Sequence, residues 1–174
     1  ETVQLINTDG KLLKTIKYAA GTFSSDPQYR LVEPAFSGSG KNMVAGDRSG
    51  SDIIVYDVPT STQQLHLKNA HIGSITGIEF LNENIFISGS GDERFKLWGI
   101  DGKLSGEFFL LENNEWVFST ADGRFDGSAG AIKKLYYAQG FQTIPMDNLY
   151  EKFYTPNLLV NILQNGEMPA PDVD

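Results

Sequence analysis

The sequence contains no cysteine among its 174 residues, which excludes disulfide bonds and cysteine-ligated zinc sites. Basic residues are also few, since 14 lysines and arginines stand against 22 acidic residues and give a formal net charge of -8. Phosphate binding needs clustered lysine and arginine, and no such cluster occurs, so we expect no nucleic-acid partner. No apolar run reaches the roughly 18 residues that indicate a membrane-spanning helix. We therefore expect no membrane association.

The remaining composition is typical of a soluble globular protein that is rich in turns. Hydrophobic residues make up 40% of the chain, charged residues 21%, and there are 18 glycines. The length predicts one domain with a sizeable core, and glycine-rich turns between short apolar runs favour an all-β fold. The compartment stays unknown, with the cytoplasm slightly favoured. The chain begins at Glu1 without methionine, and we expect it to be a fragment of a longer protein.

Short runs of β-forming residues alternate with turn residues along the first two thirds of the chain. Asp9-Gly10 and Asp101-Gly102 both suit a tight hairpin turn. The predicted strands are residues 3–6, 12–18, 30–36, 42–45, 53–57, 64–68, 74–81, 85–88, 95–98 and 104–110.

These predicted strands repeat with a regular period. Residues 96–104 align with residues 4–12 through a shared Asp-Gly-Lys-Leu turn. Ile6, Tyr56 and Trp98 then occupy equivalent positions, at steps of 50 and 42 residues. A period of about 40–45 residues is typical of β-propeller blades.

One repeat carries a distinctive order of polar residues, in which His71 is followed by Ser88, Asp92 and Trp98. This order resembles one blade of a WD40-repeat β-propeller, and the resemblance covers residues 1–111. It implies that the four side chains form a hydrogen-bonded structural tetrad. The physical need is clear, because a buried indole N–H requires an acceptor and buried polar groups must satisfy one another. Alanine precedes His71 where the family usually has glycine, and glycine follows Trp98 where it usually has aspartate.

The resemblance implies an all-β fold, a partial WD40-type β-propeller of about three to four blades with a short two-helix C-terminal element. We expect blades over residues 1–111, a degenerate terminal blade over 112–144, C-terminal helices over 145–166 and a flexible tail over 167–174. A seven-bladed ring needs about 300 residues, so further blades must come from a parent chain, a second chain or a symmetric copy. A half ring alone would leave apolar inter-blade faces exposed.

The C-terminal part shows helical periodicity. Apolar residues fall on one helical face from Met146 to Phe153 and again from Leu158 to Leu163. Between the two stripes, Thr155 suits the N-cap of the second helix, because its hydroxyl can accept from a free backbone N–H.

Three patterns that suggest chemistry are better explained as structure. His71, Ser88 and Asp92 are the residue types of a hydrolytic triad, but Ser88 lies inside a predicted strand without a nucleophile elbow. The Ser-Gly run at 37–41 departs from the phosphate-loop template, and the two Asp-Gly pairs at 122–127 lack the ligand pattern of a calcium loop. We therefore predict no catalytic residue, no cofactor and no metal site.

Residues 115–163 carry a second resemblance. Trp116-Val117, the run from Thr120 to Ser128, and the Phe-Tyr-Thr-Pro run at 153–156 look like a segment at the end of some bacterial WD40 proteins. In those proteins the propeller shares a polypeptide with a caspase-like peptidase domain. Because this chain has no cysteine, it is not such a peptidase itself. The resemblance implies only that a partner domain of that kind could exist outside it.

The expected function is protein–protein interaction, as a scaffold or regulatory module, because repeat folds bind through loops that a rigid scaffold presents. The expected partners are proteins and the other blades of the ring. The resemblance places four residues in the loops of the narrow face, and these are the partner-binding candidates: Arg48, Asn69, Ile72 and Glu93.

Two alternatives remain open. The chain is an adaptor or sensor module of a multidomain caspase-like peptidase protein, or it is half of a propeller enzyme with a site in the central channel. A channel site would need convergent carboxylates or histidines on the first strands of the blades. Those strands offer only Glu33 and Glu79, which argues against the enzyme.

Overall fold

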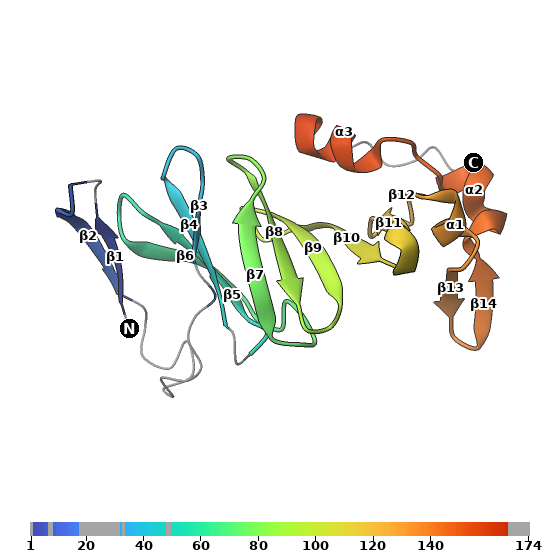
Figure 1. Cartoon of the computed structure of the whole chain (residues 1–174), viewed down its shortest axis with the longest axis horizontal. Helices are drawn as coiled ribbons and strands as arrows, with labels where there is room; N and C mark the ends of the chain where they lie inside the picture. Colours follow the sequence, from blue (N-terminus) through green and yellow to red (C-terminus); the bar gives the residue numbers. More distant parts are fainter. Residues whose placement is uncertain (1, 7–8, 18–31, 33, 48–49, 167–174) are drawn as a thin grey trace.

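The computed structural model describes residues 2–6, 9–17, 32, 34–47 and 50–166, which form antiparallel β-sheets followed by short helices (Figure 1). A hairpin pairs β1 (Thr2–Ile6) with β2 (Leu12–Lys17). A four-stranded sheet follows, here called the second sheet, with its strands in chain order: β3 (Ala35–Phe36), β4 (Asn42–Gly46), β5 (Ile53–Asp57) and β6 (Thr62–Leu67).

The next sheet, here called the third sheet, also has its strands in chain order: β7 (Ile75–Phe80), β8 (Ile85–Ser90), β9 (Arg94–Gly99), β10 (Leu104–Leu110), β11 (Trp116–Ser119) and β12 (Phe125–Gly127). A last hairpin pairs β13 (Tyr136–Gln139) with β14 (Gln142–Pro145). Four antiparallel strands paired in chain order are the unit of a propeller blade. The predicted all-β fold of a partial propeller, with short helices at its C-terminal end, is confirmed.

The second sheet is buried on both faces, because its central strands are apolar at successive positions. Along β5, Ile54 and Tyr56 face the β1–β2 hairpin, where Ile16 packs on them. Val55 points the other way, into a core that it shares with Trp98 of the third sheet. Each such buried apolar side chain contributes about 1.5–3 kcal/mol. The hairpin, the second sheet and the third sheet consequently stack side by side, as Figure 1 shows.

The sequence pattern predicted that the strands between residues 112 and 144 form one further blade, and they do not share a sheet. β11 pairs with β10 and β12 pairs with β11, so both extend the third sheet, while β13 and β14 form a hairpin of their own. The physical reason lies in the aromatic residues of β10 and β11. The pairing places Phe108 opposite Phe118 and stacks the ring of Phe108 on Trp116 at 5.4 Å between centroids.

The helical region also differs from the prediction at one point. A 3-10 turn, Met146–Leu149, leads into α2 (Tyr150–Phe153), and α3 (Leu158–Asn165) follows. The predicted N-cap at Thr155 is wrong, because α3 begins after Asn157, which has a left-handed φ of 60°. The backbone N–H of Thr155 instead donates to the carbonyl of Phe125 at 2.9 Å, which ties the chain to the start of β12.

The short helix α1 (Ala129–Ile132) and a 3-10 turn, Glu112–Asn114, complete the described elements. None of the helices in the described part of the chain is long or apolar enough to cross a lipid bilayer. The predicted tail at 167–174 lies outside the described residues.

Candidate functional site

The structure brings His71, Ser88, Asp92 and Trp98 together in one chain of hydrogen bonds. The indole Nε1 of Trp98 donates to Ser88 Oγ at 2.8 Å, and Ser88 Oγ lies 2.8 Å from His71 Nε2. The other ring nitrogen, His71 Nδ1, lies 3.0 Å from an oxygen of Asp92. Because the carboxylate of Asp92 can only accept, the Nδ1–H of His71 donates to it, and Nε2 of the neutral imidazole accepts from the hydroxyl of Ser88. Every member then has a partner.

Burial and hydrogen bonding set the charges in this chain. Burial lowers the pKa of His71 below its usual value of 6.5, against the opposing influence of Asp92, so the imidazole is neutral at pH 7. Burial alone would raise the pKa of Asp92. Hydrogen bonds from Ile72 N–H, from His71 and from Arg94 N–H outweigh that effect and lower the pKa of Asp92 to about 2. Asp92 is therefore the charged end of an otherwise neutral chain.

Asp92 connects two loops at one end of the third sheet. It accepts from the N–H of Ile72, in the β6–β7 loop, at 3.0 Å, and from the N–H of Arg94 at 3.1 Å. The two loops approach so closely that a Cβ on Gly73 would lie 2.7 Å from the backbone nitrogen of Asp92. Lys96 adds a further tie, because its Nζ donates to the carbonyl of Ala70 at 2.9 Å.

Three of the four predicted partner-binding residues lie in the part of the chain that the structure describes, and all three are at these loops. Ile72 is 88% exposed although its backbone is held by Asp92. Glu93 is exposed in the β8–β9 turn with a φ of 64°, and Asn69 is exposed in the β6–β7 loop with a φ of 52°. Arg48, the fourth candidate, lies outside the described residues.

A second polar cluster at the same end of the sheets has no counterpart in the sequence interpretation. His66 Nε2 lies 2.7 Å from Asp52 Oδ2, and the other oxygen of Asp52 accepts from the N–H of Asn69 at 2.9 Å. Asp52 stands just before β5 as Asp92 stands just before β9. An acidic residue before the third strand of each repeat is the sequence feature that could have pointed to Asp52.

The arrangement of the tetrad does not suit hydrolytic chemistry. Ser88 is 0% exposed, and its hydroxyl is shared between Trp98 and His71, whereas a nucleophile must be reachable by its substrate. Of the two acids considered for a channel site, Glu33 lies outside the described residues and Glu79 is exposed on β7. Among the residues that the structure describes, no three histidine or acidic side chains are grouped to hold a metal ion.

No family model matches the chain. A vacuolar membrane protease of Arthroderma otae (strain ATCC MYA-4605 / CBS 113480) is 33% identical over 107 residues, which cover 57% of this chain but 11% of that protein. Among solved structures, the WD40 repeats of RRP9 match with 18% identity and a TM-score of 0.47, over 66% of this chain and 37% of that one. Strand order and sheet stacking define the fold independently of this likeness.

Proposed function

We propose that the chain is a protein–protein interaction module that binds its partner through the loops around Ile72. The observation that carries the proposal is the combination of an exposed apolar side chain with a fixed backbone. Ile72 is 88% exposed, and its N–H is held by Asp92, which is itself held by the buried His71. A preorganised loop loses little conformational entropy on binding, so more of the contact energy appears as affinity.

The surroundings of Ile72 suit a protein partner. Glu93 and Asn69 are exposed polar residues on the adjoining turn and loop. An apolar anchor with polar neighbours is the usual composition of a protein–protein contact, in which a few central side chains supply most of the binding energy. The chain carries a formal net charge of -8, which favours partners with a basic surface.

Site-specific photo-crosslinking tests this function. A photoreactive residue is placed at position 72 in one sample and at position 81 in another, and each is exposed to an extract of the source organism. Leu81 is the matched control because it is also an exposed apolar residue, at the other end of β7. A protein captured at position 72 but not at 81 is then purified and titrated against the chain.

The titration decides the proposal. We expect Ile72→Ala to weaken binding about tenfold, which corresponds to about 1.4 kcal/mol, and Leu81→Ala to leave it unchanged. Glu93→Gln, which removes a charge without changing the positive φ requirement, should weaken binding less. A partner that binds the Ile72→Ala variant as tightly as the unaltered chain would remove the proposal.

An adaptor role in a multidomain peptidase protein is the second candidate. The packing of the C-terminal segment against the third sheet favours this role. Residues 116–119 pair with β10, and Leu158 of α3 packs under the same sheet, so a domain attached through this region would be held firmly against the blades. The gene that encodes the chain tests this role, because an adaptor requires a peptidase domain in the same reading frame.

A further inference from the structure

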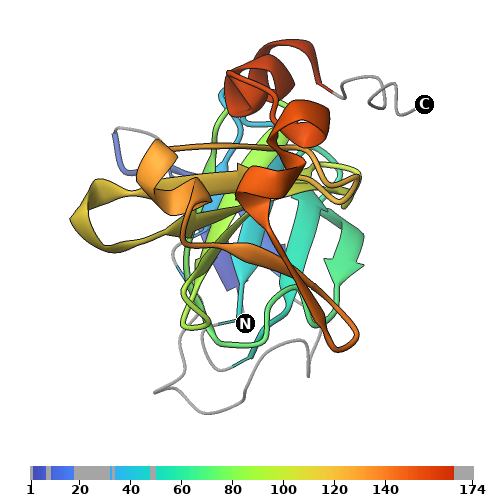
Figure 2. The same ribbon diagram turned by 90° about the vertical axis from the view of Figure 1, so that its right-hand side faces the viewer.

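A hollow of about 470 Å³ lies between the C-terminal end of α3 and two turns of the third sheet, β7–β8 and β9–β10. The helix is placed there because Leu158 and Ile162 are buried against Leu97 and Phe118 of the sheet. Figure 2 shows the C-terminal elements lying across this end of the stacked sheets. The expectation that a partial ring leaves its apolar inter-blade faces exposed is therefore wrong at this face.

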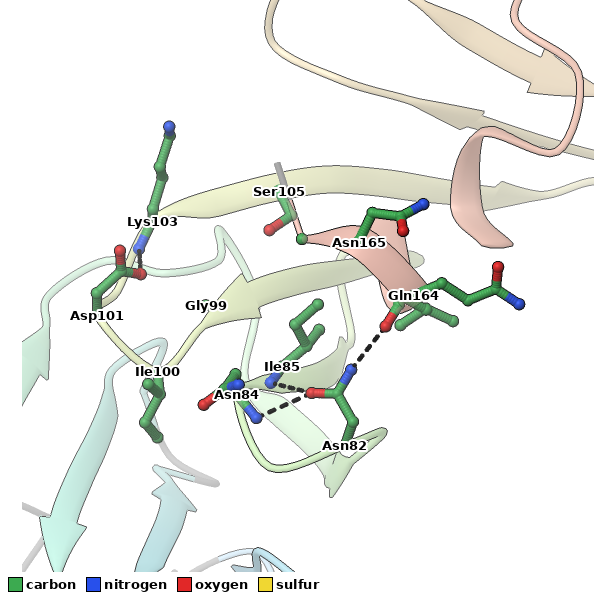
Figure 3. A pocket seen from close by; sticks show the side chains of 12 residues that line it. Asn82, Asn84, Ile85, Gly99, Ile100, Asp101, Lys103, Ser105, Gln164 and Asn165 are labelled. Carbon is green, nitrogen blue, oxygen red and sulfur yellow. Dashed lines mark hydrogen bonds between the residues drawn. The ribbon is translucent and has the colours of Figure 1, made fainter. Parts of the chain in front are cut away.

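Hydrogen bonds hold the walls of the hollow together. The side-chain amide of Asn82 donates to the carbonyl of Leu163 at 3.1 Å, which ties the β7–β8 turn to α3 (Figure 3). The side-chain oxygen of Asn82 accepts from the N–H groups of Asn84 and Ile85, each at 2.8 Å. The N–H of Ile100 donates to the carbonyl of Asn84 at 2.8 Å and so joins the two turns. Walls fixed in this way lose little conformational entropy when a ligand enters.

Negative charge gathers around the hollow. Asp101 Oδ1 accepts from the N–H of Lys103 at 3.0 Å, which holds the carboxylate in place. The other oxygen, Oδ2, makes no hydrogen bond or ion pair with a residue that the structure describes. The C-terminal end of α3 adds partial negative charge, because the last carbonyls of a helix have no partner within it.

The lining offers nothing to balance this charge from inside. Among the described residues that line the hollow, only Lys103 is basic. Figure 3 shows its ammonium group pointing away from the other labelled side chains. The chain as a whole carries a formal net charge of -8. A cationic ligand is therefore attracted to the hollow, whereas an anion is repelled from it.

The shape and chemistry of the lining favour a guanidinium group over an ammonium group. Ile85 and Ile100 provide an apolar wall, on which the methylene stem of a basic side chain can pack. The acceptor oxygens come from separate elements: Asp101 in a turn, Ser105 on β10 and Asn165 at the end of α3. A planar guanidinium has five N–H donors and can meet several such oxygens at once, whereas an ammonium has three.

We propose that this hollow binds an arginine side chain that a protein partner presents. The guanidinium group lies against the Asp101 carboxylate and the C-terminal end of α3, and the stem lies on the apolar wall. This site is separate from the proposed partner contact at Ile72, because Ile72 precedes β7 and the hollow adjoins the turn after it. Either proposal can therefore fail without the other.

A titration followed by NMR tests the site in the whole chain. The probe is N-acetyl-arginine amide, and N-acetyl-citrulline amide is the matched control, because it has nearly the same shape but no charge. We expect the arginine probe to shift the backbone amide signals of Asp101 and Ser105 and to leave that of Ile72 in place. The citrulline probe should bind about tenfold more weakly, since charge-assisted hydrogen bonds are the stronger ones. Guanidinium chloride should also bind more weakly, because it lacks the stem.

Paired variants locate the charge that the arginine probe recognises. Asp101→Asn keeps an oxygen for the N–H of Lys103 but removes the charge, and Asp147→Asn is the control at an exposed acid outside the hollow. We expect about fivefold weaker binding for Asp101→Asn and no change for Asp147→Asn, the scale of one solvent-accessible ion pair.

A second pair keeps the test decisive if Asp101→Asn fails to fold. Asn165→Lys adds a cation at the exposed end of α3, where it should repel the arginine probe, and Asn148→Lys adds the same charge outside the hollow. We expect only Asn165→Lys to weaken the binding of the probe. The melting temperature of each variant checks that it is folded.

Three results would overturn the proposal. The first is equal affinity for the arginine and citrulline probes, which would mean that charge is not recognised. The second is arginine-induced shifts that leave Asp101 and Ser105 unmoved. The third is a folded Asp101→Asn or Asn165→Lys variant that binds the arginine probe as tightly as the unaltered chain. Loss of partner binding by Ile72→Ala leaves this proposal unaffected.

Discussion

The indole nitrogen of Trp98 and the hydroxyl oxygen of Ser88 lie 2.8 Å apart, in a site where Ser88 has no contact with solvent. This hydrogen bond crosses between two adjacent strands, β8 and β9, and faces the second sheet through the shared core around Trp98. It therefore couples the hydrogen bonding within the third sheet to the packing of that sheet on the second sheet. The exposed loop at Ile72 depends on the same chain of contacts, through His71 and Asp92.

Trp98→Phe should destabilise the chain without changing its fold. Phenylalanine retains most of the apolar area but has no donor, so the buried Ser88 loses one of its two partners. The expected cost is on the order of 1–3 kcal/mol in the free energy of unfolding, measured from urea denaturation. Trp116→Phe is the matched control, because Trp116 is only half-buried and phenylalanine can retain the stacking on Phe108. If both variants lose the same free energy of unfolding, the hydrogen bond of Trp98 does not contribute to stability.

His71 makes the stability of the chain depend on pH in the mildly acidic range. Burial lowers the pKa of His71 in the folded state below 6.5, so the unfolded chain binds a proton there more readily than the folded chain. Stability is therefore full above about pH 6.5 and falls as the pH drops below that value. We expect the melting temperature to decrease between pH 7 and pH 5, and His71→Gln to flatten that slope. An unchanged slope in the His71→Gln variant would show that another group causes the pH dependence.

Asp92 adds a separate loss of stability at lower pH. Its pKa is about 2 in the folded state against 3.8 for a free aspartate, so the carboxylate stabilises the fold above pH 3.8. That contribution is lost as the pH falls from 3.8 toward 2. Asp92→Asn should remove this acidic transition. Its absence from the unaltered chain would contradict the hydrogen bonds assigned to Asp92.

The polar chain around Ser88 was the part of the site most accessible from the sequence. Four residue types in a fixed order mark it, and the resemblance to a WD40 blade implies that they group, which agrees with the need of each for a partner when buried. The Asp52–His66 pair was missed because two residues 14 positions apart show no such pattern until the strand register is known. The structure aligns Ile54 with His66 across β5 and β6, and Asp52 then falls beside the ring.

Long-range pairing accounts for the other differences. The sequence pattern predicts that residues 116–119 form a strand, but a strand's alternation does not say which edge it joins. The apolar stripe of α3 likewise predicts that one face of the helix is buried, but it does not indicate that this face packs on the third sheet. Thr155 has the chemistry of an N-cap, yet its N–H donates to the carbonyl of Phe125 at the start of β12. That carbonyl is 30 positions away in the sequence, beyond the reach of any local motif.

Asp92→Asn should also loosen the loop that carries Ile72. The amide side chain retains one oxygen acceptor, so it cannot hold Ile72 N–H, Arg94 N–H and His71 as the carboxylate does. We expect faster hydrogen exchange of the Ile72 and Arg94 amides at pH 7, measured by NMR. Asp101→Asn is the control, since Asp101 also accepts a turn N–H, from Lys103, but lies in the β9–β10 turn. Unchanged exchange at Ile72 would mean that Asp92 does not order this loop.

Gly106→Ala tests the placement of β11 against β10. A Cβ on Gly106 would lie 2.4 Å from the ring of Phe118 and 2.7 Å from the backbone oxygen of Ser119, so it cannot be added without moving β11. We expect a loss of about 1–3 kcal/mol in the free energy of unfolding, because the tightly packed site must distort to accept the methyl group. Gly77→Ala in β7 is the control, since nothing lies within 4 Å of its added Cβ. If β11 belonged to a separate blade, Gly106 would face open space and the two variants would be equally stable.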